Sequence, residues 1–325
     1  MHRGPRMKRV CKRWLGIAAI VLQCCGLLSA ARGQTGTRLP RTGSGTKYVG
    51  KNSQATAIIN WNAPLPPAAV MRQRVLANLK NTRAEQERYV CNTTQETAQT
   101  DKNGNVKKRD VRQYNMFFVN GQEIDEMTSK DGKPLNAEEQ KKESERVQKK
   151  ISKDSDVQYV AKRQADDEKQ VDMLLRMLRY TNGHRIALNG RPTLVYDLSG
   201  DPNVHPKGLQ ETFLHDMTGT IEVDEPTGEL VDLNARLDHD VKIGGGILAN
   251  LHKGFWLHVR QQRYADGVWL PEVIEGTGDA RAALFFHPYF RFKQAMNGCA
   301  LTSVTTSEAN NAVVQPANPA SGPSH

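Results

Sequence analysis

The chain has 325 residues, of which 38% are hydrophobic and 25% are charged, and its formal net charge is +10 at pH 7. The first 33 residues hold seven of the 45 Lys and Arg residues and none of the 35 Asp and Glu residues. Without them 38 basic residues stand against 35 acidic ones, so net charge gives no support to a nucleic-acid-binding protein.

Residues 1–33 have the pattern of a signal peptide. A basic stretch from Arg3 to Arg13 precedes an apolar run from Leu15 to Leu28, and small residues follow. The run is short for a spanning helix, which needs about 20 residues, so export to a bacterial periplasm is favoured over a signal anchor. Lipidation at Cys24 or Cys25 would require a Leu-x-x-Cys box, which the sequence matches poorly. No later segment is apolar enough to span a membrane.

Composition divides the rest of the chain into three parts. Residues 34–65 are rich in Gly, Thr, Ser and Asn, and residues 303–325 in Ala, Asn, Pro and Ser, so both segments are predicted to be disordered. Residues 66–302 lie between them and are predicted to form a single domain, because no repeat and no Pro/Gly-rich linker interrupts them.

The domain is predicted to begin with a helix and a meander of three strands. Pro66 and Pro67 suit the first turn of the helix, and apolar residues follow at helical spacing. The strands begin at Tyr89 and continue through Met127, with turns near residues 101–105 and at Asn120-Gly121.

A helical insertion is predicted at residues 130–179. Its first helix begins at a capping box formed by Asn136 and Glu139, and a second helix runs from about residue 156 to residue 179. The apolar end of the second helix consists of the candidate lid residues Val171, Leu174, Leu175 and Leu178. Two interpretations remain open: this end closes over the sheet as a lid, or it packs permanently on the core.

Strands resume near residue 186, and a short helix is predicted around residues 209–215. The segment 219–292 then reads as a series of antiparallel strands, in which Val231, Leu233 and Leu237 alternate with polar residues at period two. Strands, a helical insertion and more strands give an α+β order rather than an alternating one.

Motifs for catalysis or for a cofactor are lacking in the sequence. There is no metalloprotease helix, phosphate-binding loop, Gly-x-Ser-x-Gly elbow or Cys-x-x-Cys pair, so we expect a non-enzymatic protein without metal or cofactor. Gly244, Gly245 and Gly246 are interpreted as a loop at the sheet rim rather than a phosphate cradle. Cys91 and Cys299 could pair in an oxidising compartment, but two separate thiols are favoured because nothing in the sequence sets their distance.

Four segments resemble exported bacterial proteins of the lipoprotein-sorting type, the LolA, LppX and RseB superfamily. They are residues 101–105, 117–121, 131–135 with the following Glu-rich helix, and 268–271. The resemblance covers most of residues 67–295 and makes residues 66–302 a LolA-like domain. It implies a strongly curved antiparallel sheet, an unclosed half-barrel, whose concave face is covered by helices. It also implies a cavity for lipid or acyl chains.

The resulting hypothesis is a periplasmic carrier that binds a lipid, a lipoprotein acyl chain or another apolar ligand between sheet and helices. The main alternative is an envelope stress sensor or scaffold that binds a protein partner, and the third is a hydrolase that uses His and Asp near the Gly-rich loop. The candidate cavity residues are the apolar residues expected on the inner face: Tyr114, Met116, Phe118, Val231, Leu233, Leu237, Leu257, Val259, Leu284 and Phe286.

Overall fold

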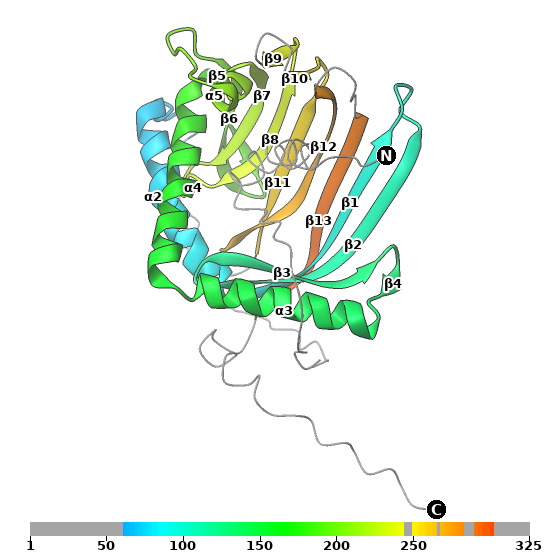
Figure 1. The fold of residues 1–325 in the computed structure, drawn as a ribbon. Coiled ribbons are helices and arrows are strands. Elements are labelled where there is room, and N and C mark those ends of the chain that lie inside the picture. Colours follow the sequence, from blue (N-terminus) through cyan, green and yellow to red (C-terminus); the bar gives the residue numbers. More distant parts are fainter. Residues whose placement is uncertain (1–60, 244–248, 265–266, 283–288, 302–325) are drawn as a thin grey trace, which may run out of the picture.

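The computed structural model describes residues 61–243, 249–264, 267–282 and 289–301. In this part of the chain thirteen strands form one antiparallel sheet, and helices α2–α5 pack against it (Figure 1). The strands are β1 (Tyr89–Thr100), β2 (Val106–Val119), β3 (Gln122–Lys130), β4 (Lys133–Pro134), β5 (Leu178–Leu188), β6 (Arg191–Gly200), β7 (Met217–Asp224), β8 (Leu230–Leu237), β9 (Val241–Ile243), β10 (Ala249–Leu251), β11 (Trp256–Arg263), β12 (Trp269–Ala282) and β13 (Tyr289–Leu301).

The sheet is open and curved. Eleven strands follow the order β4-β3-β2-β1-β13-β12-β11-β8-β7-β6-β5, while β9 and β10 pair with each other beside β12. The first long strand therefore lies next to the last one in the middle of the sheet, and β4 and β5 form its two ends. Figure 1 shows the sheet bending round toward the helices. The predicted α+β class and unclosed antiparallel sheet are confirmed.

Short turns with a left-handed backbone set the register of the outer hairpins. Both central residues have positive φ at Asn120-Gly121, Asp131-Gly132 and Asn189-Gly190, with values between 49° and 76°. Type I′ turns require this conformation, and Asn or Asp followed by Gly adopts it at the lowest steric cost. The sequence therefore specifies these hairpins locally.

Three of the helices start and end close to where the sequence predicts. They are α2 (Ala68–Gln86), α3 (Ala137–Asp154) and α5 (Leu209–His215). At the start of α3 the predicted capping box is present: the Asn136 side chain accepts a hydrogen bond from the Glu139 amide (2.9 Å), and the Glu139 carboxylate accepts one from the Asn136 amide (3.0 Å). The fourth helix, α4 (Val157–Met177), is capped by Asp156 and ends two residues before the predicted boundary.

Helix α3 covers the edge of strand β3 along the side opposite β2 (Figure 1). Glu143 accepts a hydrogen bond from the Met127 amide (2.7 Å), and Arg146 and Lys150 donate to the carbonyl oxygens of Asp125 and Glu123. These groups belong to the edge that would otherwise offer unpaired backbone to other chains. Three polar side chains of this helix therefore satisfy the polar backbone of a strand.

The main hydrophobic core lies between the concave face and the helices α4 and α5. Its members that are at most 1% exposed include Met116, Leu237, Leu257, Leu270 and Ile274. Helix α5 adds Phe213, whose ring meets that of Phe255 edge-on at 5.5 Å. Each such side chain stabilises the fold by roughly 1.5–3 kcal/mol through the removal of apolar surface from water.

A disulfide joins Cys91 in β1 to Cys299 in β13. The expectation of two separate thiols is therefore wrong. The two strands are neighbours in the sheet, and their register shifts between Val90 and Asn92, opposite Ala300 and Asn297. This irregularity brings the cysteines to a Cα separation of 4.0 Å, which sequence spacing over 208 positions does not reveal.

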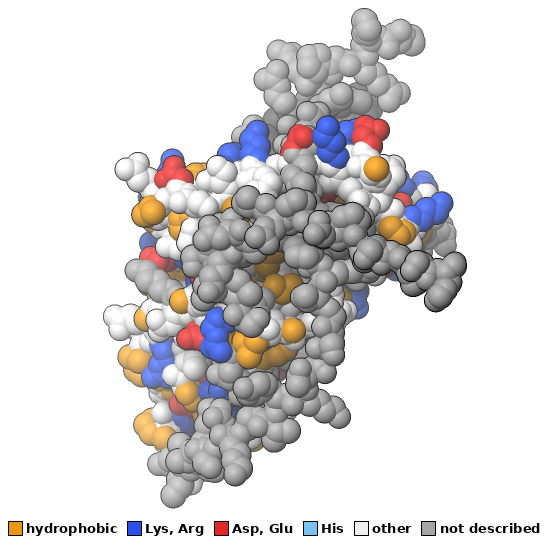
Figure 2. Space-filling view, turned by 90° about the horizontal axis from the view of Figure 1, so that it is seen from below, with side chains coloured by type: hydrophobic (Ala, Val, Ile, Leu, Met, Phe, Trp, Pro, Cys, Tyr) orange, Lys and Arg blue, Asp and Glu red, His pale blue; other side chains and the backbone are white. Residues whose placement is uncertain are grey.

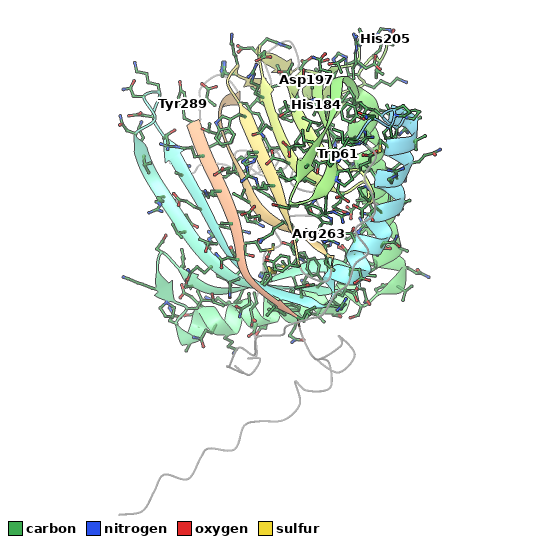
Figure 3. All side chains as sticks on the ribbon, turned by 180° about the vertical axis from the view of Figure 1, so that it is seen from behind. Trp61, His184, Asp197, His205, Arg263 and Tyr289 are labelled. Carbon is green, nitrogen blue, oxygen red and sulfur yellow. A yellow bond between two sulfur atoms is a disulfide. The ribbon has the colours of Figure 1, made fainter. Side chains whose placement is uncertain are left out.

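The segment before α2 lies along the β5–β6 hairpin. Arg185 donates hydrogen bonds to the carbonyl oxygens of Trp61 (3.1 Å) and Ala63 (3.0 Å), and Trp61 is labelled beside these strands in Figure 3. A Cβ atom on Gly183 would lie 2.6 Å from the Tyr196 ring and 2.9 Å from Leu65. The strand approaches its neighbours so closely here that only glycine fits.

The described helices include none that is both long and apolar enough to cross a membrane. Seen from below, hydrophobic side chains are visible near the middle of the molecule, with Lys, Arg, Asp and Glu side chains scattered around them (Figure 2). Residues 1–60, which contain the predicted signal peptide, lie outside the described residues.

Candidate functional site

A cavity of about 570 Å³ lies between α2, the second half of α4 and the concave face of strands β5–β8. We call it the α2–α4 cavity. Its apolar wall consists of Ala68, Ala69, Met71, Val75, Leu79, Val171, Leu174, Leu175, Leu178, Leu198, Ile221, Val223, Leu230 and Leu233, together with the rings of Tyr180 and Tyr196. Its polar and charged lining residues are Arg72, Thr82, Arg83, Gln86, Asp167, Arg176, Arg179, Asp201, Glu229 and Gln261.

Helix α4 covers this cavity without filling it. All four candidate lid residues line the cavity: Val171, Leu174 and Leu175 from the helix, and Leu178 from the first position of β5. Leu178 belongs to the strand because the helix ends at Met177. These four residues therefore border a hollow space between the helix and the sheet.

A β-bulge decides which residues of β8 face the cavity. Val223 pairs with Leu230 and Glu222 with Asp232, so the register shifts by one residue at Val231. Leu230 and Leu233 therefore point to the same side and line the cavity, whereas strict alternation would group Leu233 with Val231. Val231 is 4% exposed but does not line the cavity.

The other candidate cavity residues lie elsewhere. The residues Met116, Phe118, Leu237, Leu257 and Val259 belong to the packed main core and are not part of the cavity lining. Tyr114 on β2 is half-buried, and burial raises the pKa of its hydroxyl. Two further candidates, Leu284 and Phe286, lie outside the described residues, as do the rim-loop residues Gly244, Gly245 and Gly246.

Sequence reasoning missed one whole wall of the cavity. On α2, Met71, Val75 and Leu79 show helical spacing, which by itself predicts a buried face but not what that face covers. On the strand side, Tyr196 shares one face of β6 with Leu194 and Leu198, which predicts an inward position, and Tyr180 of β5 lies opposite Leu198. The Tyr180 ring meets the Tyr196 ring edge-on at 6.0 Å, and burial raises its pKa.

Ion pairs connect the two helices that form the outer wall. Arg83 of α2 donates to Asp167 of α4 (Nη2–Oδ2, 3.1 Å), and Arg72 donates to Asp172 (Nε–Oδ1, 2.9 Å). Asp172 also pairs with Arg176 (Nε–Oδ2, 3.0 Å). The Arg83 and Asp167 side chains are only 14% and 20% exposed, while that of Arg176 is 53% exposed. The first pair therefore lies in the protected part of the wall, and Arg176 lies near the solvent.

Glu229 is the most deeply buried ionisable residue in the cavity wall. It is 9% exposed and accepts hydrogen bonds from Asn78, from Thr82 (Oγ1–Oε2, 2.9 Å) and from Gln261 (Nε2–Oε1, 3.3 Å). These three hydrogen-bond partners are all uncharged, and among the described residues no cation pairs with Glu229. Burial raises the pKa of Glu229 to about 7, against the weaker opposing effect of these hydrogen bonds.

A second polar cluster lies between β3 and α3, away from the cavity. Burial, and next the neighbouring Asp125, raise the pKa of Glu123 well above its usual range. Burial also raises the pKa values of Asp125 and Asp154, although Lys150 opposes both shifts. In the described residues, no group of three or more His, Cys, Asp or Glu side chains has the geometry to hold a metal ion.

Comparisons with known proteins identify no family. No protein-family model matches the chain, and no curated protein matches it. A crystal structure of MucB in complex with MucA(peri) is a structural neighbour at a TM-score of 0.20 and 10% identity, covering 73% of this chain and 100% of that chain. A TM-score this low does not place the chain in a family, so the resemblance to the LolA, LppX and RseB superfamily stays a prediction.

Proposed function

We propose that this protein is a non-enzymatic carrier or receptor that binds an apolar ligand, such as a lipid or an acyl chain, in the α2–α4 cavity. The observation that carries the proposal is the cavity itself, whose wall is built mainly from Leu, Val, Ile and Met side chains and two tyrosine rings. With residues 1–33 acting as a signal peptide, the protein would meet this ligand in the periplasm.

The size of the cavity suits a small amphiphile. Sites for small molecules usually enclose about 300–1,000 Å³ and combine apolar walls with a few polar groups. Each methylene that leaves water for an apolar wall contributes about 0.8 kcal/mol, so about ten methylenes contribute about 8 kcal/mol before the cost of immobilising the chain. The polar residues of the lining would receive a head group or its water.

A substitution that fills the cavity tests the proposal. Leu175 lines the cavity and is not part of the main core, so Leu175→Trp should fill the space with limited effect on the packing elsewhere. Val157→Trp is the matched control, because Val157 lies on the same helix and is 80% exposed. Binding of a fluorescent fatty-acyl probe to the purified protein should be lost in Leu175→Trp and kept in Val157→Trp. Circular dichroism should confirm that both variants fold.

Native mass spectrometry of protein purified from its own host provides the second measurement. We expect an added mass that corresponds to one lipid or acyl-chain species, and we expect Leu175→Trp to lack it. If the wild-type protein carries no such mass and binds no acyl probe, the carrier function is wrong. A scaffold that binds a protein partner would then become the leading hypothesis.

A further inference from the structure

We propose that Glu229 makes ligand binding in the α2–α4 cavity proton-linked, so that the protein holds an apolar ligand in acid and releases it as the pH rises. This inference rests on the proposed function. It concerns the regulation of ligand binding in that cavity, which no motif in the sequence indicates.

The position of Glu229 is the first argument. Glu229 lines an otherwise largely apolar cavity and is 9% exposed, and its carboxylate accepts hydrogen bonds from the uncharged groups of Asn78, Thr82 and Gln261. A ligand that occupies the cavity removes further water from this wall. Loss of water disfavours the ionised form of a carboxyl group, so an apolar ligand binds more tightly to the protonated protein.

The charged neighbours do not offset this effect. Arg83 and Asp167 line the same cavity from α2 and α4, but they pair with each other. From β7, Asp224 disfavours the ionised form of Glu229, although Asp224 itself pairs with Arg191. Of the remaining charged lining residues, Arg72 and Arg176 both pair with Asp172. The others are Arg179 and Asp201, of opposite charge.

The sign of the effect follows from the raised pKa of Glu229, which lies at about 7 in the free protein. A ligand that raises this pKa further takes up a proton when it binds near neutral pH. Affinity is therefore highest well below pH 7 and falls as the pH rises through that value. Each additional pKa unit caused by the ligand corresponds to a tenfold difference in affinity between the two protonation states.

A ligand without an ionisable group is needed, because any pH dependence of its binding must then come from the protein. We suggest binding of a long-chain monoacylglycerol, measured by displacement of a neutral fluorescent probe between pH 5.5 and pH 8.5. Wild-type protein should bind about tenfold more weakly at the upper end of this range. Glu229→Gln should remove most of this dependence. Glu222→Gln is the control, because burial also raises the pKa of Glu222. This residue lies opposite Asp232 in the β7–β8 register and does not line the cavity.

The outcomes distinguish this inference from the function on which it rests. Binding with equal affinity across the pH range, or a pH dependence that persists in Glu229→Gln, would overturn the proton link and leave the carrier function standing. No binding at any pH would overturn both. If Glu229→Gln does not fold, calorimetry on the wild-type protein in two buffers of different ionisation enthalpy measures proton uptake directly. Proton uptake near zero on ligand binding at pH 7 would then overturn the proton link.

Discussion

The disulfide between Cys91 and Cys299 should be a large single contribution to stability. It links strands β1 and β13 across 208 positions of the chain, so it constrains most of the domain in the unfolded state. For a loop of this length, chain-entropy reasoning gives about 5 kcal/mol at 25 °C, and measured losses on removal of native disulfides are about 2–5 kcal/mol. We expect the Cys91→Ala/Cys299→Ala double variant to lose an amount in the measured range.

The assay is equilibrium unfolding in guanidinium chloride, followed by tryptophan fluorescence. Wild-type protein should be compared with the double variant and with reduced wild-type protein, because Cys91 is 1% exposed and its replacement also removes buried packing. The reduced protein retains both sulfur atoms and so isolates the cross-link itself. Equal unfolding midpoints for oxidised and reduced wild-type protein would refute the reasoning, as would two thiols that react with a thiol reagent after unfolding without reductant.

Three further substitutions test local interactions and titration. Asn136→Ala should cost about 1 kcal/mol in urea unfolding, because it removes the cap of α3; an unchanged midpoint would contradict this role. Glu143→Ala should cost about 1–3 kcal/mol and speed hydrogen exchange at the Met127 amide, which loses its acceptor. Glu229 has a pKa raised from 4.5 to about 7, so its burial should lower stability progressively as the pH rises between these values, by about 3 kcal/mol in total. Without ligand, Glu229→Gln should remove that part of the pH dependence in thermal unfolding, and an unchanged slope would argue against it.

Local features of the fold followed from the sequence with good accuracy. The capping box at Asn136, the short helix at residues 209–215 and the turns at Asn120 and Asn189 each depend on interactions within a few residues. Such interactions join residues that are close together in the sequence, and distant parts of the chain have little influence on them. The open antiparallel sheet followed from the period-two pattern and from the resemblance that the sequence shows.

The candidate site was less accessible to sequence reasoning. Apolar alternation shows that Leu233, Leu237 and Leu257 face inward, but it does not show which of them meet another side chain and which border a cavity. Because of the bulge at Val231, Leu230 lines the cavity and Val231 does not, although both residues are apolar and adjacent. A one-residue change of register leaves no mark in such a run, because either choice buries a hydrophobic side chain.

The sequence by itself determined most strands, the helices and the apolar end of α4, because hydrophobic periodicity and capping act over short distances. The start of β5 at Leu178, eight residues before the predicted one, was not among them. Only the tertiary structure decided that α4 spans a cavity, that Cys91 meets Cys299, and that the buried carboxylate of Glu229 in the cavity wall accepts hydrogen bonds from Asn78, Thr82 and Gln261, all uncharged. These three features depend on where segments far apart in the sequence come to lie, such as Asn78 and Glu229, which are 151 positions apart. The curvature of the sheet and the packing of α2 and α4 over one end of it set those distances.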